Sequence, residues 1–248
     1  MRSRRHLMWA VLALLLGVGL AGWSHAQNIP LVTANNSKAG VVYSVPVQTL
    51  LILTALSFLP AALMLMTSFT RILIVFSLLR QALGLQGMPP NIVLIGLSFL
   101  LTLFVMNPVL EPIYQEAYLP LSRGELTLDQ AVDKAAVPLK TFMLKQTRQD
   151  DLNMFAKLHN KPIATRADVP MTVLIPAFAI SEIKTGFLIG FLIYMPFIAI
   201  DFAVASILTS LGMVMVSPMM LSLPLKLVLF ALADGWTLLA GSLVASFQ

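Results

Sequence analysis

The sequence predicts an all-α integral membrane protein. Hydrophobic residues make up 58% of the 248 residues and charged residues only 11%, against roughly 25% charged residues in soluble domains. The apolar residues form runs that approach or exceed the 20 or so residues with which a helix crosses a bilayer. A charged side chain in such a run costs about 2.5–3.5 kcal/mol, so it is expected to face a bundle interior, a water-filled path or a partner subunit. Five such charges interrupt residues 171–248: Glu182, Lys184, Asp201, Lys226 and Asp234.

Residues 1–26 have the pattern of a cleavable signal peptide. Arg2, Arg4 and Arg5 precede an apolar stretch at residues 7–20, and the sequence Ser-His-Ala ends at Ala26, after which cleavage is expected. The alternative is an uncleaved first transmembrane helix. Cleavage removes three of the 16 basic residues, which leaves 13 against 11 acidic residues, a net charge of +2. No basic patch interleaved with aromatic residues is present, so no nucleic-acid partner is predicted. Residues 27–46 then form an N-terminal segment on the periplasmic side.

Residues 47–110 predict a hydrophobic helical hairpin. A first span at 47–66 is interrupted at 67–71 and resumes at 72–83, and the only charges in the hairpin are Arg71 and Arg80. Residues 84–90 contain two glycines and a pair of prolines, a composition typical of turns. A second helix is expected at 91–106, closed by Asn107 and Pro108.

Residues 111–170 predict an amphipathic, helical polar insert that faces water. The stretch 111–168 contains eight acidic and eight basic residues. Thr127 and Gln130 have the spacing of a capping box, which starts a helix. Apolar residues then recur at helical spacing, with Pro138 expected to bend the helix: Leu128, Val132, Ala135, Leu139 and Phe142. A second short helix is expected at 150–159.

Residues 171–248 predict a second hydrophobic hairpin with a methionine-rich loop. Its two apolar blocks are 173–211 and 218–247, and Pro196, Pro218 and Pro224 are expected to break helices. The two hairpins together predict four spans. Arg71 and Arg80 then lie near a cytoplasmic turn, in agreement with the positive-inside rule, and the polar insert lies in the periplasm.

Small residues four apart suggest close helix packing. Gly186 and Gly190 form a GxxxG motif, and Ala199 and Ala203 continue the spacing. Asp201 has two interpretations. It is either a structural charge paired with Lys184, Lys226 or a partner chain, or part of a proton or ion relay with Asp234.

Four of the 14 methionines lie within eight residues, at Met213, Met215, Met219 and Met220. Methionine is adaptable, so the cluster suits either ordinary core filling or a deformable hydrophobic constriction. The chain has no cysteine, which excludes thiol nucleophiles and thiolate metal sites. No P-loop, GxSxG or HExxH motif is present. No enzymatic activity, metal or cofactor is therefore predicted.

Several longer motifs resemble the FliP family of flagellar export-gate proteins, whose injectisome counterpart is SctR. The most specific is PAFAISEIKTGF at 176–187, followed by PFIAID at 196–201, LGM at 211–213, LPLKL at 223–227 and DGW at 234–236. TSFTR at 67–71 and QGMPP at 86–90 extend the resemblance to the N-terminal half. The similarity covers essentially the whole chain after residue 26, and the signal peptide favours the flagellar branch.

The resemblance implies a core pore-forming subunit of the flagellar type III protein export gate. Such a subunit passes unfolded rod, hook and filament proteins across the bacterial inner membrane and has no chemistry of its own. The family fold is a set of helical hairpins that assemble into a helical oligomer, a pentamer of this chain with FliQ and FliR subunits and FlhB at the entrance. Much of this assembly lies toward the periplasm in the flagellar basal body, so not every apolar helix needs to cross the bilayer.

The resemblance also assigns roles to residues. The family's pore gasket corresponds to Met213, Val214 and Met215, where Val214 departs from the three methionines that are frequent in relatives. Charges at subunit contacts or along the conduit correspond to Arg71, Glu182, Lys184, Asp201, Lys226 and Asp234. Two other functions are compatible with the residues alone: a proton-coupled secondary transporter that uses Asp201 and Asp234, and an assembly factor that does not line the path.

Overall fold

A computed structural model describes residues 35–37, 40–42, 50, 53–54, 57–58, 62, 64–159, 165–213 and 215–247. The chain divides into two compact units, Met1–Leu59 and Pro60–Gln248. In the first unit, β1 (Asn35–Ser37) and β2 (Gly40–Val42) form a short antiparallel hairpin with Ser37 opposite Gly40. Apart from this hairpin, the regular structure of the described residues is helical, as predicted. The predicted signal peptide lies outside the described residues.

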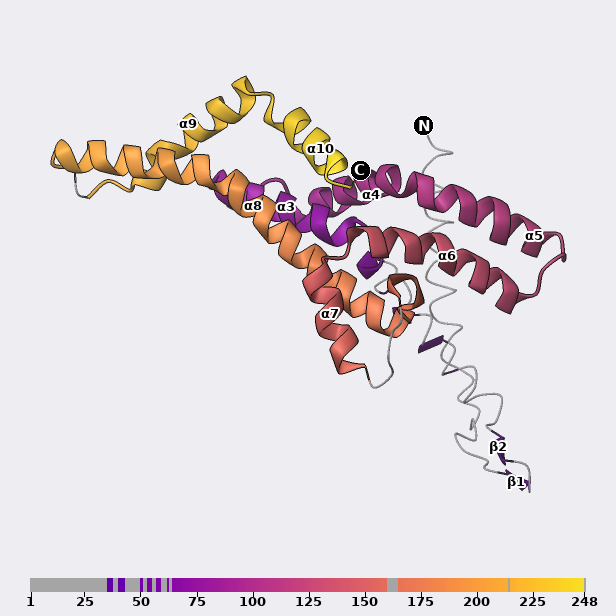
Figure 1. Cartoon of the computed structure of the whole chain (residues 1–248). Helices are drawn as coiled ribbons and strands as arrows, with labels where there is room; N and C mark the ends of the chain where they lie inside the picture. The colour runs from indigo at the N-terminus through magenta and orange to yellow at the C-terminus, as the bar shows by residue number, and fades with distance from the viewer. Residues whose placement is uncertain are drawn as a thin grey trace, which may run out of the picture. The chain divides into compact units, whose positions relative to one another are not determined.

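The second unit consists of helices joined by short connections (Figure 1). In chain order they are α3 (Phe69–Ala82), α4 (Asn91–Ile113), the π-helical turn η1 (Tyr114–Tyr118), α5 (Leu119–Ser122), α6 (Leu128–Gln146), α7 (Gln149–Leu158), the short 3-10 helix η2 (Arg166–Asp168), α8 (Met171–Ser210), α9 (Pro218–Leu232) and α10 (Gly235–Ala245).

The second hydrophobic helix is longer than predicted. It was expected to end at Asn107 and Pro108, but α4 continues through Pro108 and Pro112 and joins η1 and α5 in a run of 32 residues, Asn91–Ser122. A proline removes one backbone hydrogen bond, whereas a helix end leaves four carbonyl groups without intrahelical partners. In apolar surroundings the continued helix is therefore the less costly arrangement.

The same reasoning applies to the C-terminal hydrophobic blocks. Pro196 lies inside α8 and Pro224 inside α9, so the predicted breaks at these two prolines are wrong. Pro218 occupies the first turn of α9, where a proline costs no hydrogen bond. The chain instead bends by 65° between α9 and α10. Asp234 has φ +48° there, a left-handed conformation that aspartate tolerates better than most residues.

Two helices of the described residues are long and apolar enough to cross a membrane, Asn91–Ser122 and Met171–Ser210. The bent pair α9 and α10 makes a third if it counts as one span. Four spans were predicted. α3 has only 14 residues, and most of the range 47–66 lies outside the described residues, although those of its positions that are described are mostly helical.

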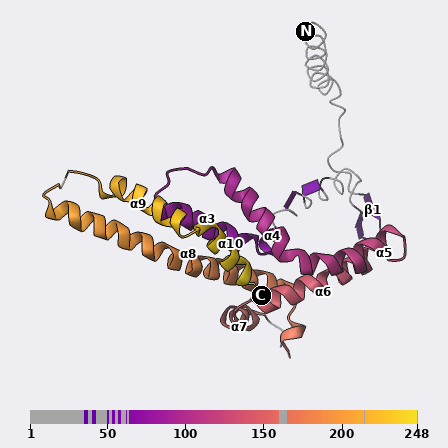
Figure 2. The same ribbon diagram turned by 90° about the horizontal axis from the view of Figure 1, so that it is seen from above.

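The core of the second unit forms where α3 lies beside α8, as both views show (Figures 1 and 2). Ile72, Val75, Phe76 and Leu79 recur at helical spacing on the buried side of α3. From α8, the fully buried side chains include Leu174, Ala177 and Phe178. α4, α6, α7 and α9 pack around this pair of helices.

α6 and α7 lie where the polar insert was predicted to be helical. The predicted capping box is confirmed, because the Gln130 N–H donates to Thr127 Oγ1 over 3.4 Å and the Thr127 N–H donates to Gln130 Oε1 over 3.1 Å. The predicted apolar face of α6 is only partly buried, since Phe142 is buried but Leu128 is exposed. Both helices pack against α8, and their side of the membrane stays a prediction.

Two glycines of α8 determine how closely α3 approaches. A Cβ atom added at Gly186 would lie 3.2 Å from Ile74 Cβ, and one added at Gly190 would lie 2.2 Å from Leu78 Cδ1 and 3.0 Å from Leu78 Cβ. Gly190 follows Gly186 along α8, and its contact Leu78 follows Ile74 along α3. The two helices therefore run in the same direction. Ala199 and Ala203, further along α8, are exposed.

Gly190→Ala is expected to destabilise the folded chain by about 1–3 kcal/mol, because the added methyl group overlaps Leu78 in a packed interface. Gly241→Ala is the matched control. Gly241 also lies within a helix, but a Cβ there meets no atom within 4 Å, so alanine should leave stability unchanged or raise it by about 0.5–1 kcal/mol. Thermal unfolding of the two variants in detergent measures the difference. Equal unfolding temperatures would contradict the close α3–α8 contact.

Candidate functional site

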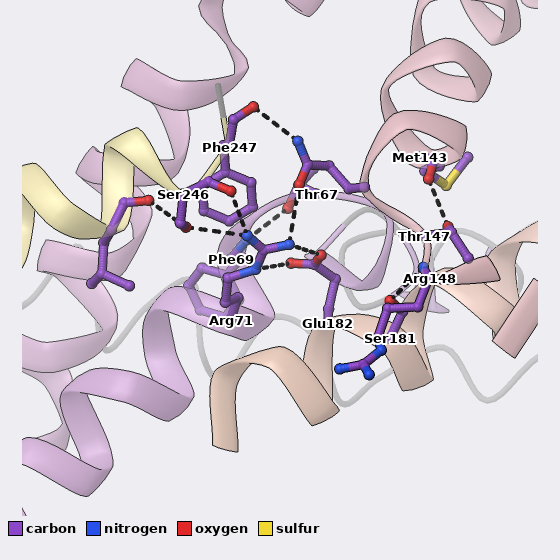
Figure 3. A network of polar contacts seen from close by, with 12 residues as sticks. Thr67, Phe69, Arg71, Met143, Thr147, Arg148, Ser181, Glu182, Ser246 and Phe247 are labelled. Atoms are coloured by element: carbon purple, nitrogen blue, oxygen red, sulfur yellow. Dashed lines mark hydrogen bonds and ion pairs between the residues drawn. The ribbon is translucent and has the colours of Figure 1, made fainter. Parts of the chain in front are cut away.

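The first functional group is a buried ion pair between α3 and α8. The Arg71 Nε–H donates to Glu182 Oε2 over 3.0 Å, and a second guanidinium N–H donates to Glu182 Oε1 (Figure 3). The two residues are only 2% and 0% exposed. The parallel contacts make a bidentate arrangement, which is the strongest geometry for this pair of groups. The sequence predicted both buried charges, but gave no sign that residues 111 positions apart would meet.

A second ion pair attaches α7 to the first half of α8. The Lys184 ammonium contacts Asp151 Oδ1, and Asp151 is 2% exposed although the Lys184 side chain is about half exposed. Nearby, the Arg148 backbone N–H donates to Ser181 Oγ over 2.9 Å (Figure 3). Lys184 was considered as a partner of Asp201, and its partner is instead Asp151. Nothing in the local sequence distinguished Asp151 from Asp150 beside it.

The third group joins α8, α9 and the end of α3. Lys226 Nζ lies 2.6 Å from Asp201 Oδ2 and donates to the Ala82 carbonyl oxygen over 3.1 Å. Ser222, one turn earlier on α9, donates its hydroxyl to Asp201 Oδ1 over 2.5 Å. Lys226 is 3% exposed. Asp201 is therefore the paired structural charge, with the second of the two lysines considered from the sequence.

Asp234 lies exposed at the bend between α9 and α10. Its Oδ1 accepts a hydrogen bond of 3.1 Å from the Thr237 hydroxyl, three residues ahead on α10. Asp201 and Asp234 thus have different local roles: Asp201 pairs with the buried Lys226, and Asp234 accepts a hydrogen bond at the start of α10. The relay interpretation, which requires the two acids to act together, stays a prediction that these contacts do not support.

The methionine-rich loop lies between α8 and α9. Gly212, with φ +73°, ends α8, and Met213 and Met215 follow outside any helix. Met213 is 43% exposed and Met215 99% exposed, so neither fills the core of its own chain. Val214 lies outside the described residues. Met219 and Met220 belong to the first turn of α9 and are also exposed.

The described residues do not bring three or more His, Asp or Glu side chains together in a way that could hold a metal ion. The site therefore consists of three ion pairs within a helical bundle and an exposed apolar loop.

This combination defines a class of protein, an α-helical membrane-type protein whose apolar helices carry paired charges. The comparison with known families narrows the class. The model of the FliP family matches residues 52–243, and the chain belongs to this family.

Three relatives illustrate the similarity, each of them a flagellar biosynthetic protein FliP. That of Pectobacterium carotovorum is 53% identical over 223 residues, which cover 90% of this chain and 86% of that protein. That of Bacillus subtilis is 52% identical over 204 residues, which cover 81% of this chain and 91% of that protein. That of Buchnera aphidicola subsp. Baizongia pistaciae is 50% identical over 226 residues, covering 91% of this chain but 63% of that longer protein.

Asp201→Ala is expected to destabilise the fold by about 3–5 kcal/mol, because it leaves the buried Lys226 ammonium without its counter-charge. The yield of folded, detergent-extracted protein and its unfolding temperature measure the loss. The double variant Asp201→Ala, Lys226→Leu removes both charges and should regain most of the stability. A double variant no more stable than the single one would show that the cost does not come from the unpaired lysine.

Proposed function

We propose that this chain is a core pore-forming subunit of the flagellar type III protein export gate. In this role it passes unfolded rod, hook and filament proteins across the bacterial inner membrane during flagellum assembly. Membership of the FliP family supports a place in flagellar biosynthesis and export. The pore-forming role is carried by one observation, the exposed methionine loop at the junction of α8 and α9.

The loop has the properties that a seal around a moving polypeptide needs. Methionine is flexible and apolar, so it can close around chains of different sequence without specific contacts. Met213 and Met215 lie in a loop that follows a 40-residue helix, and they are 43% and 99% exposed, so neither is fixed in the core of its own chain. Rings of hydrophobic side chains can gate a pore by excluding water. Met213, Val214 and Met215 are accordingly the proposed gasket.

The exposed apolar surface supports assembly with other subunits. Phe187, Phe191 and Phe202 on α8 are each more than half exposed, as are Leu225 and Val228 on α9. Lipid or other helices must cover these side chains. The proposed partners are further copies of this chain in a pentamer, FliQ and FliR subunits, and FlhB at the entrance.

The length of α8 supports a location partly outside the bilayer. A helix of 40 residues extends about 60 Å, roughly twice the ~30 Å thickness of the hydrocarbon core. Its first half carries the Glu182 and Lys184 ion pairs and the contacts with α6 and α7. We therefore propose that this half stands on the periplasmic side of the inner membrane, within the flagellar basal body.

An assembly factor that does not line the path is the competing function. The two are separated by placing a photo-crosslinking amino acid at Met215 and stalling an export substrate within the complex. A crosslink to the substrate supports the pore subunit, whereas crosslinks to other gate subunits alone support the assembly factor.

Replacing Met213 and Met215 together with alanine is expected to raise the ion conductance of the reconstituted gate severalfold, because the constriction loses its largest side chains. Assembly should persist, because the change leaves the exposed apolar faces of α8 and α9 intact and neither methionine fills the core of its own chain. Conductance in planar bilayers and the mass of the purified complex are the two measurements.

The double variant Met219→Ala, Met220→Ala is the matched control, because it removes two methionines that are also exposed, at 55% and 77%, but lie in the first turn of α9. It should leave the conductance near the wild-type value. Equal leakage from both double variants, or from neither, would contradict the gasket.

A further inference from the structure

The turn that follows α10 binds to a buried polar site on the opposite side of the Arg71 side chain from Glu182 (Figure 3). One guanidinium N–H group donates to the Ser246 carbonyl oxygen over 3.0 Å and to Ser246 Oγ over 3.1 Å. The Phe247 ring lies against the guanidinium, with 3.9 Å from Arg71 Cζ to the ring centroid. Phe247 is 7% exposed. Arg71 therefore recognises both the backbone and the side chain of this turn.

Gln146, the last residue of α6, completes the site. Its Oε1 accepts a hydrogen bond of 3.2 Å from Arg71, and its Nε2 donates to the Phe247 carbonyl oxygen over 2.8 Å. The Phe142 ring, one turn earlier on α6, stacks on Phe247 with 6.4 Å between centroids. Residues from α3 and α6 thus contact two successive carbonyl groups and one aromatic ring of the turn.

Apolar burial alone would hold α10 only weakly on the α3–α8 core. Of its 11 residues, only Leu239 and Leu243 are buried. Lipid tails and detergent are as apolar as the core, so burial of α10 brings no hydrophobic gain in a membrane. Van der Waals packing and directional polar contacts therefore hold α10 in place, and the polar contacts nearest to it are those of Ser246 and Phe247.

We propose that Ser246 and Phe247 form a latch, and that Arg71, Gln146 and Phe142 form its receptor. Docking of the latch holds α10 on the α3–α8 core. Helices α9 and α10 then form an arch with polar attachments at two points, Lys226 on α9 and the latch after α10. The 65° bend at Asp234 lies between these attachments. Release of the latch lets α10 move about this bend while Lys226 keeps α9 in place.

The latch is independent of the proposed pore function, because it concerns the position of α10 within a single chain. Hydrogen–deuterium exchange of the full-length protein in detergent tests it, since exchange reports local opening segment by segment. Phe247→Ala is expected to accelerate exchange across residues 236–247 about tenfold or more, because the loss of the ring contacts with the Arg71 guanidinium and with Phe142 favours the open state. Exchange in α3, α7 and the first half of α8 should stay at the wild-type rate.

Gln146→Ala is the second variant, and it removes the receptor's hydrogen bond to Phe247 without altering the latch. It should accelerate the same segment and no other. Leu238→Ala is the matched control: Leu238 lies on α10 but is 61% exposed, so its exchange pattern should equal that of the wild type. Unchanged exchange of α10 in both Phe247→Ala and Gln146→Ala would overturn the latch. So would an acceleration that spreads equally to α3 and α8, because the turn would then be an ordinary part of the core.

Discussion

The ion pair between Arg71 and Glu182 fixes how the two halves of the chain meet. Both groups are buried between apolar helices, where an unpaired charge is far more costly than at a surface. The two helices therefore have one alignment in which neither charge is left alone. From that point the contacts advance one turn at a time, from Arg71 to Ile74 to Leu78 on α3 and from Glu182 to Gly186 to Gly190 on α8. The charges set the register, and the glycines allow the backbones to approach once the register is set.

The sequence predicted the helical class and most helix starts, because these depend on local patterns. The capping box at Thr127 and the glycine- and proline-rich turn before Asn91 are examples. Prediction from the sequence was less successful where a local rule, such as the helix-ending effect of proline, conflicts with the apolar surroundings. Proline usually ends a helix in water, yet Pro108, Pro196 and Pro224 lie within helices here. An apolar environment makes any further loss of backbone hydrogen bonds more costly than the kink. The actual bend occurs at Asp234, whose left-handed conformation is a property of one residue and not of a pattern.

For the charged residues, the need for a partner is visible in the local sequence, whereas the identity of the partner is not. A charged residue in an apolar run is visible in the sequence, and the need for a partner follows from electrostatics alone. The identity of the partner depends on packing between segments distant in the sequence. Asp201 meets Lys226 from the same hairpin, one of the two lysines considered from the sequence. Glu182 meets Arg71 and Lys184 meets Asp151, and both of these partners belong to other parts of the chain.

The difference between polar and apolar contacts explains why a deformable loop can follow a helical bundle that is held by ion pairs. Asp201 and Lys226 join α8 to α9 about 14 Å before the end of α8, at 1.5 Å per residue, and Lys226 also binds the end of α3. Beyond that point no further ion pair links the described residues of α8 and α9, and Met213 and Met215 are exposed. Polar contacts are directional and hold the base of the hairpin in one geometry. Methionine contacts are non-directional and let the tip adapt. In the proposed gate, a hairpin built in this way would hold the base of the loop in one geometry, while the exposed Met213 and Met215 could change shape around a passing polypeptide.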